Sequence, residues 1–317
     1  MIKHGLRTII LKKMENKNIH DCIKANIAAL TKEHSERFPQ IPLYDKTMPS
    51  TDHLRRVIDE IKNIVFPSYF GPSVNVHSLK YHTEVSLERL YKLLQEQIYR
   101  ALSFDFIEEE THSCDTQKRA SILCIHFIDK LSQIKYMLST DVKAIFEGDP
   151  AAKNYAEIIF CYPAIKAILN YRVASELFLL KIPLIPRIIS EMAHADTGID
   201  IHPGAKIGSH FSIDHGTGVV VGQTAIIGKH VRLYQGVTLG AKSFSFDTDG
   251  KAIDKPRHPI LEDHVTIYSN ASILGRITIG AGSIVGGNLW LTNSVPANSR
   301  VLQTKAIESA FSDGSGI

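Results

Sequence analysis

The chain has little of several features that assign a protein to a class at once. Only four of its 317 residues are cysteine, and no two of them have the C-x-x-C spacing of a zinc or redox site. We therefore expect reduced thiols and a cytoplasmic location. There is no run of about 18 apolar residues and no small-residue cleavage site after the basic N-terminus, so we predict neither a membrane span nor a signal peptide. A net charge of +3 is too small to indicate a strongly basic nucleic-acid surface.

What is present is a chain long enough for two domains, with 44% hydrophobic and 22% charged residues. Residues 46–195 have the three-and-four apolar spacing of amphipathic helices, which predicts a helical domain. Residues 196–300 repeat every six residues. Residues 1–45 are weakly patterned and predict a loose arm, and residues 301–317 predict a flexible tail.

The helical domain is predicted from several apolar stripes. One consists of Leu54, Val57, Ile58, Ile61 and Val65, and a second of Leu87, Leu90, Leu94 and Ile98. A third pattern runs through Ile122, Ile125, Ile128, Leu131 and Ile134. A further helix is expected after Asp149-Pro150, because proline suits a first helical turn. Helices packed into a bundle would bury all of these stripes.

The six-residue repeat predicts a parallel β-helix. Thirteen hexads place an aliphatic residue on one register: Ile201, Ile207, Ile213, Val221, Ile227, Leu233, Leu239, Leu261, Ile267, Ile273, Ile279, Val285 and Leu291. A second inward column, two residues before the first, includes Ala205, Phe211, Ala225, Val231 and Val237. Three hexads make one coil, so thirteen give about four coils. The predicted fold class is therefore α+β, an N-terminal α-helical bundle followed by a parallel β-helix.

The repeat is interrupted at two places that are rich in polar side chains. A two-residue slip contains the run IDHGTG at residues 213–218, and an excursion between Leu239 and Leu261 ends in KPRHP at residues 255–259. Interruptions of a solenoid form loops on its binding face. The candidate functional residues are therefore expected there.

These interruptions carry a specific resemblance. The run DIHPGAKIGSHFSIDHGTGVVVGQTAIIG at residues 200–228, followed by LYQGVTLG and RHP, resembles serine acetyltransferase, a family of hexapeptide-repeat acyltransferases. The similarity covers the β-helix and extends back to EGDPAAKNY at Glu147. The stretches IVFPSYFG at 64–71 and WLTNSVPANSRV at 290–301 resemble the long-N-terminus branch of that family.

The resemblance implies a left-handed β-helix, although the general crossover rule would favour right-handed coils. It also implies an enzyme that transfers the acetyl group of acetyl-CoA to L-serine, the first step of cysteine biosynthesis, with L-cysteine as feedback inhibitor. The flat faces of such a prism commonly pack together. We therefore expect a homo-oligomer, either a trimer or a dimer of trimers.

The family's catalytic base falls on His215, and its partner carboxylate falls on Asp200. A serine hydroxyl is a poor nucleophile until its proton is removed, and a neutral imidazole suits that task near pH 7. A carboxylate that accepts the other ring N–H would fix the tautomer and stabilise the imidazolium. The implied reaction is direct acyl transfer without an acyl-enzyme.

The implied acceptor is a zwitterion, so its pocket needs charges of both signs. By resemblance, Asp214 and Asp149 meet the ammonium group. Arg257 and His258 meet the carboxylate, since arginine forms two parallel hydrogen bonds with a carboxylate. Asp149 also has an ordinary alternative role as a helix cap before Pro150.

The donor positions match less specific residues. Acetyl-CoA is implied as co-substrate, and the family positions that contact it match Gly240, Ala241, Ser269 and Gly287. The family's Gly-Ala-Gly-Ala run is replaced here by residues 268–271, Tyr-Ser-Asn-Ala. No metal is implied.

Four alternatives stay open at the level of sequence. The acceptor could be homoserine or an amino-sugar, or the β-helix could be a non-catalytic scaffold. The five-residue spacing of His210 and His215 also resembles the paired zinc ligands of γ-class carbonic anhydrases, which would make the protein a metal lyase.

Many family members insert a C-terminal isoleucine into O-acetylserine sulfhydrylase, which implies this partner for Ile317. The alternative is a tail that only supplies flexibility.

Overall fold

The computed structural model describes residues 19–30, 48–105, 113–243, 253 and 255–304. The chain divides into two compact units, Met1–Lys46 and Thr47–Ile317. The first contains one described helix, α2 (Ile19–Leu30), none of whose side chains is buried. In the described part of the chain, no helix combines the length and apolar character needed to cross a membrane. Ile317 lies outside the described residues.

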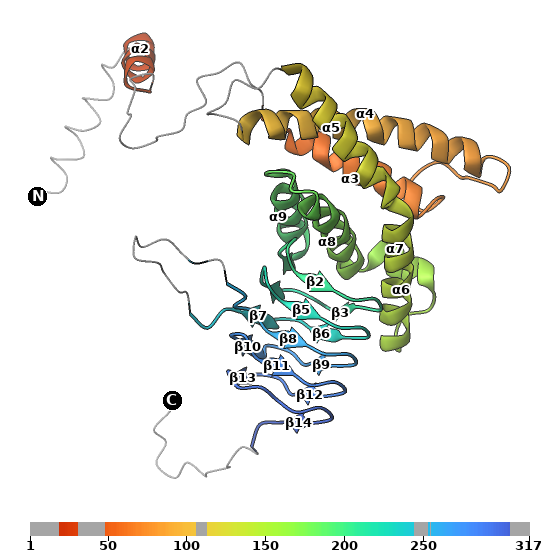
Figure 1. The fold of residues 1–317 in the computed structure, drawn as a ribbon, viewed down its shortest axis with the longest axis vertical. Coiled ribbons are helices and arrows are strands. Elements are labelled where there is room, and N and C mark those ends of the chain that lie inside the picture. The colour runs from red at the N-terminus through yellow and green to blue at the C-terminus, as the bar shows by residue number, and fades with distance from the viewer. Residues whose placement is uncertain (1–18, 31–47, 106–112, 244–252, 254, 305–317) are drawn as a thin grey trace, which may run out of the picture. The chain divides into compact units, whose positions relative to one another are not determined.

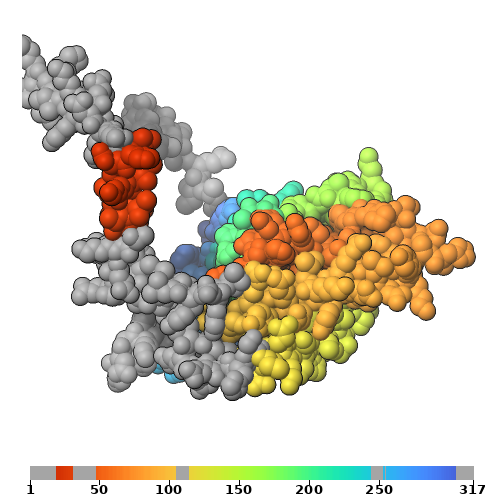
Figure 2. All heavy atoms as spheres, turned by 90° about the horizontal axis from the view of Figure 1, so that it is seen from above, coloured from red at the N-terminus to blue at the C-terminus, as the bar shows by residue number. Residues whose placement is uncertain are grey.

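The second unit begins with a layer of helices (Figure 1). They are α3 (Thr51–Val65), α4 (Leu79–Asp105), α5 (Ser113–Asp129), α6 (Leu131–Gly148), α7 (Tyr155–Cys161), α8 (Pro163–Leu179) and α9 (Ile185–Thr197). Side-chain caps set two of the starts: Ser50 accepts a hydrogen bond from the backbone of His53, and Asn154 accepts one from Glu157. In Figure 2, α3, α4 and α5 form one continuous surface, coloured orange to yellow.

Two of the predicted apolar stripes form the core of the helical layer. Leu54, Val57 and Ile61 of α3 are fully buried, and so are Leu90, Leu94 and Ile98 of α4. The third stripe was wrong in its first part. Ile122 and Ile125 are more than half exposed, while α5 buries Ala120, Cys124 and Phe127 on another face. An aromatic ring and two small side chains make that face, which aliphatic spacing alone does not detect.

The chain then winds into a prism of short strands. The described residues contain fourteen strands: β1 (Asp200–Ile201), β2 (Lys206–Ile207), β3 (Ser212–Asp214), β4 (Val220–Val221), β5 (Ile226–Ile227), β6 (Arg232–Tyr234), β7 (Thr238–Gly240), β8 (Ile260–Leu261), β9 (Thr266–Ile267), β10 (Ser272–Leu274), β11 (Thr278–Ile279), β12 (Ile284–Val285), β13 (Trp290–Leu291) and β14 (Arg300–Val301). These strands make about five turns. Thirteen hexads were predicted, so the structure has one strand more than expected.

All strand pairs in the prism are parallel. Sheet A has the order β1-β4-β7-β10-β13, sheet B has β11-β8-β5-β2, and sheet C has β14-β12-β9-β6-β3. Each of the first four coils contributes one strand to each sheet, and the last contributes β13 to sheet A and β14 to sheet C, so the coils stack along the axis in Figure 1. The predicted fold class is confirmed: an α-helical bundle followed by a left-handed parallel β-helix.

The prism has three edges, which we name by a histidine on each. The His215 edge joins sheets C and A at residues 215–219, 235–237, 268–271 and 286–289. The His258 edge joins A and B at residues 202–205, 222–225, 256–259 and 275–277. The His230 edge joins B and C at residues 208–211, 228–231, 262–265 and 280–283. Both predicted inward columns are buried, apart from partly buried members in the last coils, such as Leu289, Leu291 and Val295.

A buried ion pair fastens the helices to the first coil. Arg172 of α8 forms two hydrogen bonds with the carboxylate of Asp141 on α6, at 3.1 and 3.0 Å, and donates to the carbonyls of Ile207 and Gly208. Asp141 also accepts from the backbone N–H of Phe211. Burial raises the pKa of the Asp141 carboxyl to about 6, with Arg172 acting against the rise. The junction therefore fixes α6, whose C-terminal end enters the site described next.

Candidate active site

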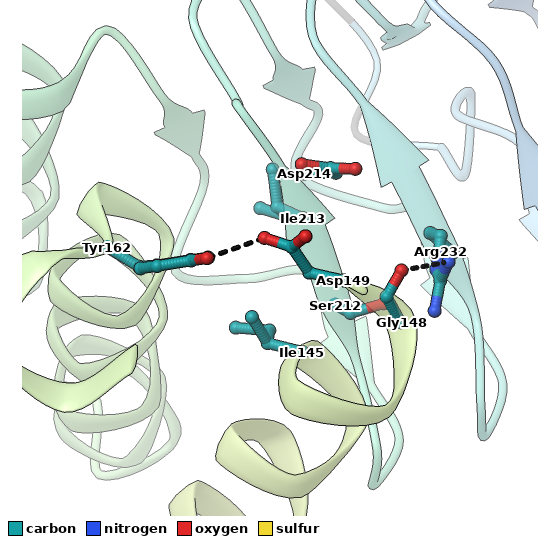
Figure 3. A pocket seen from close by; sticks show the side chains of 8 residues that line it. All are labelled: Ile145, Gly148, Asp149, Tyr162, Ser212, Ile213, Asp214 and Arg232. Carbon is teal, nitrogen blue, oxygen red and sulfur yellow. Dashed lines mark hydrogen bonds between the residues drawn. The ribbon is translucent and has the colours of Figure 1, made fainter. Parts of the chain in front are cut away.

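A pocket lies between the end of α6, the start of α8 and sheet C (Figure 3). Its lining includes Asp149, which follows α6, Tyr162, which precedes α8, and Asp214 and Arg232 on strands β3 and β6. The hydroxyl of Tyr162 donates to Oδ2 of Asp149 at 2.5 Å. Arg232 donates to the carbonyl of Gly148 at 3.0 Å. Two carboxylates thus line one small pocket.

The hydrogen bonds of this pocket keep Asp149 ionised. The Tyr162 hydroxyl and the backbone N–H of Ala151 lower the pKa of the Asp149 carboxyl, and nearby His215 acts in the same direction. The same contact raises the pKa of Tyr162 to about 12, so that its hydroxyl stays protonated and donates. A pair of carboxylates, one of them held by a tyrosine hydroxyl, is suited to an ammonium group.

His215 lies on the two-residue slip, next to the pocket residue Asp214. Its Nε2 lies 3.8 Å from Oδ1 of Asp214, and its side chain is 73% exposed. The backbone has positive φ at His215 (59°), Gly216 (91°) and Gly218 (78°), a sequence of left-handed residues that turns the chain outward. A Cβ on Gly216 would lie 2.5 Å from Cδ1 of Ile199, so only glycine fits there.

Asp200 lies beside the same slip on β1. Its N–H donates to the carbonyl of Val219, and Gly218 donates to the carbonyl of Gly198, so the slip packs directly against this segment. Burial raises the pKa of the Asp200 carboxyl, and His194 of α9 opposes the rise. Among the described residues of a single chain, no hydrogen bond joins Asp200 to His215.

Arg257 and His258 lie on the other edge and are held by Thr224. The Thr224 hydroxyl accepts hydrogen bonds from the backbone N–H groups of Arg257 and His258, at 2.9 and 3.1 Å. The guanidinium of Arg257 donates to Oε1 of Gln223 at 3.0 Å. Arg276 donates to the carbonyls of Thr224 and His258. The end of the excursion is therefore anchored to the preceding coil.

The imidazole of His258 is held neutral with a defined tautomer. Burial, with Arg257 and Arg276 nearby, lowers the pKa of His258 to about 4. Its Nδ1 accepts from the N–H of Thr224 at 3.1 Å, which leaves the ring proton on Nε2. The ring packs where a side chain on Gly222 would be, because a Cβ there would lie 1.9 Å from Cδ2 of His258. His258 thus offers an N–H donor and no charge near pH 7.

The two halves of the predicted site lie at opposite ends of one strand. His215 comes before β4. Thr224, which holds Arg257 and His258, comes after β4. The donor positions divide in the same way. Ser269 and Gly287 adjoin each other on the His215 edge, and Gly240 and Ala241 begin the turn at the His258 edge.

Comparison with known proteins places this arrangement in a family. No family model matches the chain. A curated serine acetyltransferase of Synechococcus elongatus, described as plasmid, is 44% identical over 298 residues, which cover 92% of this chain and 93% of the relative. This chain is a member of the serine acetyltransferase family.

Solved structures of the family agree with the fold. Isoform 3 of Entamoeba histolytica serine acetyltransferase, in complex with cysteine, has a TM-score of 0.68 at 32% identity over 81% of this chain and 84% of its own. Serine acetyltransferase 1 of the same organism, in complex with L-cysteine, has a TM-score of 0.67 at 34% identity over 81% and 88%. The chain thus belongs to a family of acyltransferases.

Four side chains that support the candidate site in this member of the serine acetyltransferase family were not predicted from the sequence. Tyr162 and Arg232 contact the Asp149 segment, and Thr224 and Arg276 hold the Arg257-His258 segment. Their positions depend on which coils and helices become neighbours. For Thr224, the only signal in the sequence was its fixed position within its hexad, one coil before Arg257 and His258.

The paired histidines of the metal-lyase alternative do not converge. His210 lies on the His230 edge and His215 on the other side of β3. The His210 ring stacks on His230, with centroids 4.1 Å apart. In the described residues, no three His, Cys, Asp or Glu side chains are grouped so that they could hold a metal ion.

Proposed function

We propose that the chain transfers the acetyl group of acetyl-CoA directly to the hydroxyl of L-serine, with His215 as general base. The observation that carries this is that His215 lies 3.8 Å from Asp214, which lines one pocket together with Asp149, and two carboxylates suit the ammonium group of an amino acid. Membership of the serine acetyltransferase family supports the same substrate pair.

The chemistry requires no covalent enzyme intermediate. A neutral His215 takes the proton of the serine hydroxyl, whose oxygen attacks the thioester carbonyl. The tetrahedral intermediate collapses by breaking the C–S bond, and the imidazolium returns the proton to the leaving thiolate. Asp200, on the strand beside the slip, is the proposed partner that stabilises the imidazolium.

Recognition of the acceptor carboxylate falls to Arg257 and His258. Arg257 supplies the positive charge, and His258 supplies a neutral Nε2–H donor, since its pKa is lowered to about 4. An acceptor with ammonium, carboxylate and hydroxyl groups would satisfy both halves at once. Gly240, Ala241, Ser269 and Gly287 are the proposed contacts of the acetyl-CoA donor.

One chain keeps these halves apart, so the complete site needs a second copy. Val220 and Val221 of β4 lie between them, an extended segment of roughly 7 Å. Aligned outward residues of sheet A above Asp200 carry no charge: Val220, Thr238, Ser272 and Trp290. Packing through this face in a trimer would bring the His215 edge of one copy against the His258 edge of the next.

L-cysteine is the proposed inhibitor, because it carries the same ammonium and carboxylate as serine, and two related enzymes are solved with cysteine bound. Competition with serine is the expected pattern. Binding of O-acetylserine sulfhydrylase through Ile317, and the cytoplasmic location, stay predictions.

A thiol-release assay with acetyl-CoA and separate acceptors tests the proposal. Release that depends on L-serine, and is weak with homoserine or glucosamine, is the expected result. Equal rates with all three acceptors would reject the proposed acceptor site. Silence with all three, by a chain that binds CoA, would favour the scaffold alternative.

A further inference from the structure

The end of α6 is capped by a side chain from the prism. The last four carbonyls of an α-helix have no partner inside the helix, and a left-handed glycine or a basic residue near the end commonly satisfies them. α6 has no basic residue in its last turn, and it ends at Asp149 with φ and ψ of −119° and 104°. Arg232 of β6 supplies the cap, because its Nη1 donates to the carbonyl of Gly148 at 3.0 Å (Figure 3).

The guanidinium of Arg232 also explains the glycine at position 148. Gly148 lies within α6 and its φ is outside the left-handed region, so its backbone conformation does not require glycine. A Cβ there would overlap Nη2 and Cζ of Arg232. Glycine weakens a helix relative to alanine. The chain therefore has a poor helix former at the position where the guanidinium lies against the backbone.

The capped residue leads directly into a carboxylate that is fixed on two further sides. Oδ1 of Asp149 accepts a hydrogen bond from the backbone N–H of Ala151 at 2.8 Å, and Oδ2 accepts one from the hydroxyl of Tyr162. Arg232 holds the carbonyl of the peptide group that joins Gly148 to Asp149. Contacts from the α6 end, the α8 start and β6 thus determine where the Asp149 carboxylate lies.

Arg232 also connects Asp149 to the strand that carries the second carboxylate. Arg232 is opposite Ser212 of β3 in the parallel register, and Asp214 lies two residues after Ser212. Residues two apart along a strand point to the same side of the sheet. Because Asp149 comes from the helical layer and Asp214 from sheet C, their separation depends on how the two layers are joined. The Arg232 contact is such a join, and it lies within the pocket itself.

We propose that Arg232 is a positioning residue for the amino-acid acceptor. It holds the end of α6 against sheet C, and thereby sets the separation of Asp149 and Asp214 that an ammonium group between them requires. The inference rests on the proposed function, which assigns these two carboxylates to the ammonium group of serine. Arg232 acts through Asp149 in this role, and its contact with the Gly148 carbonyl is the point at which it acts.

Steady-state kinetics with each substrate varied in turn tests this role. Arg232→Met keeps the length of the stem and removes the donor, and it should raise the serine KM about fivefold or more while leaving the acetyl-CoA KM unchanged. Arg232→Lys keeps a cationic donor and should recover part of the loss. Arg300→Met is the matched control, because Arg300 has the same register position on the last coil of sheet C and is exposed. Equal rises in both KM values, or a serine KM like that of the control, would overturn the proposal.

A double-mutant cycle separates action through Asp149 from direct contact with the substrate. In an Asp149→Asn background, Arg232→Met should change kcat/KM for serine by less than about twofold, because the carboxylate that it positions is already gone. Effects of the two substitutions that multiply would show that Arg232 acts on the substrate by another route. The positioning role would then be wrong.

Gly148→Ala displaces the guanidinium without removing its charge. The serine KM should rise about as much as in Arg232→Met, whereas the free energy of unfolding in urea should stay close to that of the unmodified chain, because the better helix former offsets the lost hydrogen bond. A cap that serves only stability predicts an unchanged serine KM in this variant. That result would reject the link to the acceptor.

Hydrogen exchange measured by mass spectrometry provides a readout that does not depend on turnover. Amides of residues 145–152 should exchange faster in Arg232→Met than in the unmodified chain, and Arg300→Met should not change them. If serine is not acetylated at all, the proposed function fails, and this comparison still shows whether Arg232 holds the end of α6. Unchanged exchange would overturn the contact, and faster exchange with unchanged serine kinetics would overturn its role in acceptor binding.

Discussion

The backbone N–H of Thr224 donates to Nδ1 of His258 across 3.1 Å, while the Thr224 hydroxyl accepts from the N–H groups of His258 and Arg257. One residue on the second coil thereby sets the tautomer of an imidazole and the path of the segment that follows the excursion. The side chains proposed to hold the substrate carboxylate depend on this one threonine.

Replacement of Thr224 by valine should weaken serine binding more than donor binding. Valine keeps the shape and removes the acceptor for two backbone N–H groups, which should raise the serine KM about fivefold or more. Thr224→Ser keeps the hydroxyl and should stay near the unmodified value. Steady-state kinetics with each substrate varied in turn measures the split; a rise confined to the acetyl-CoA KM contradicts the assignment.

His215→Asn should lower kcat by at least about 10²-fold, the usual scale for a lost general base. Asparagine tolerates the positive φ of this position, so the slip should keep its conformation. His230→Asn is the matched control, because His230 has a φ of 57° on a different edge. Calorimetry should show unchanged CoA binding in both variants. Comparable turnover by His215→Asn and the control would disprove the catalytic role.

Two inactive variants should restore each other in mixed assemblies. Asp214→Ala disables the His215 edge, and Arg257→Ala disables the His258 edge. If each site takes one edge from each of two copies, co-expression should produce about a quarter of the normal number of intact sites by random pairing. Activity of the co-purified mixture is the measurement. A mixture no more active than its parents would mean that the two edges do not cooperate between copies.

Acid should destabilise the His258 edge. Burial and neighbouring cations lower the pKa values of His202 and His258 to about 4, from the ordinary histidine value of 6.5. Between pH 6.5 and 4 the unfolded chain therefore binds more protons, so the contribution of these histidines to stability is lost as the pH falls through that window.

Asp141 acts in the opposite direction over part of the same window. Its carboxyl pKa is raised from 3.8 to about 6, so its contribution is lost as the pH rises towards 6. Urea unfolding of the unmodified chain and of a His202→Gln/His258→Gln variant, from pH 4 to 7.5, separates the two effects. The unmodified chain should lose more stability on acidification than the variant. Parallel curves would contradict the neutral state of both imidazoles.

Loss of the buried guanidinium should be costly. Arg172→Met leaves the Asp141 carboxylate buried without its partner, which should reduce the free energy of unfolding by roughly 3–5 kcal/mol. Arg187→Met removes an exposed partner of Glu191 and should cost less than about 1 kcal/mol. Urea titrations at pH 7 compare the two variants. Equal losses would show that the junction adds nothing beyond an ordinary surface pair.

The sequence predicted the prism closely because its physical cause is local. Every coil buries the same two positions of each hexad, so the period alone located Leu239, Val265 and Ile273 in the interior. The helical layer was harder. The α5 stripe that contains Phe127 was missed in favour of Ile122 and Ile125, since the buried face depends on which neighbouring helix it meets.

The candidate site also has parts that the sequence predicts and parts that depend on which elements pack together. Asp149 and Asp214, which the resemblance named for one site, line one pocket, and His215 lies next to Asp214. The Tyr162 contact could not be predicted, because it joins two loops that are close only after α6 and α8 pack together. The neutrality of His258 depends on its burial and on Arg276 one coil away, neither of which is visible from the RHP motif.

The place of Asp149 has a consequence for how the protein can be dissected. This carboxylate comes from the end of α6, whereas its neighbours in the pocket, Asp214 and Arg232, come from the prism. A fragment that begins at residue 198 would keep every inward hexad position and lose half of the proposed ammonium site. On the proposed function, the helical half supplies part of the substrate site, and we expect a minimal active version of this protein to include it from at least the start of α6.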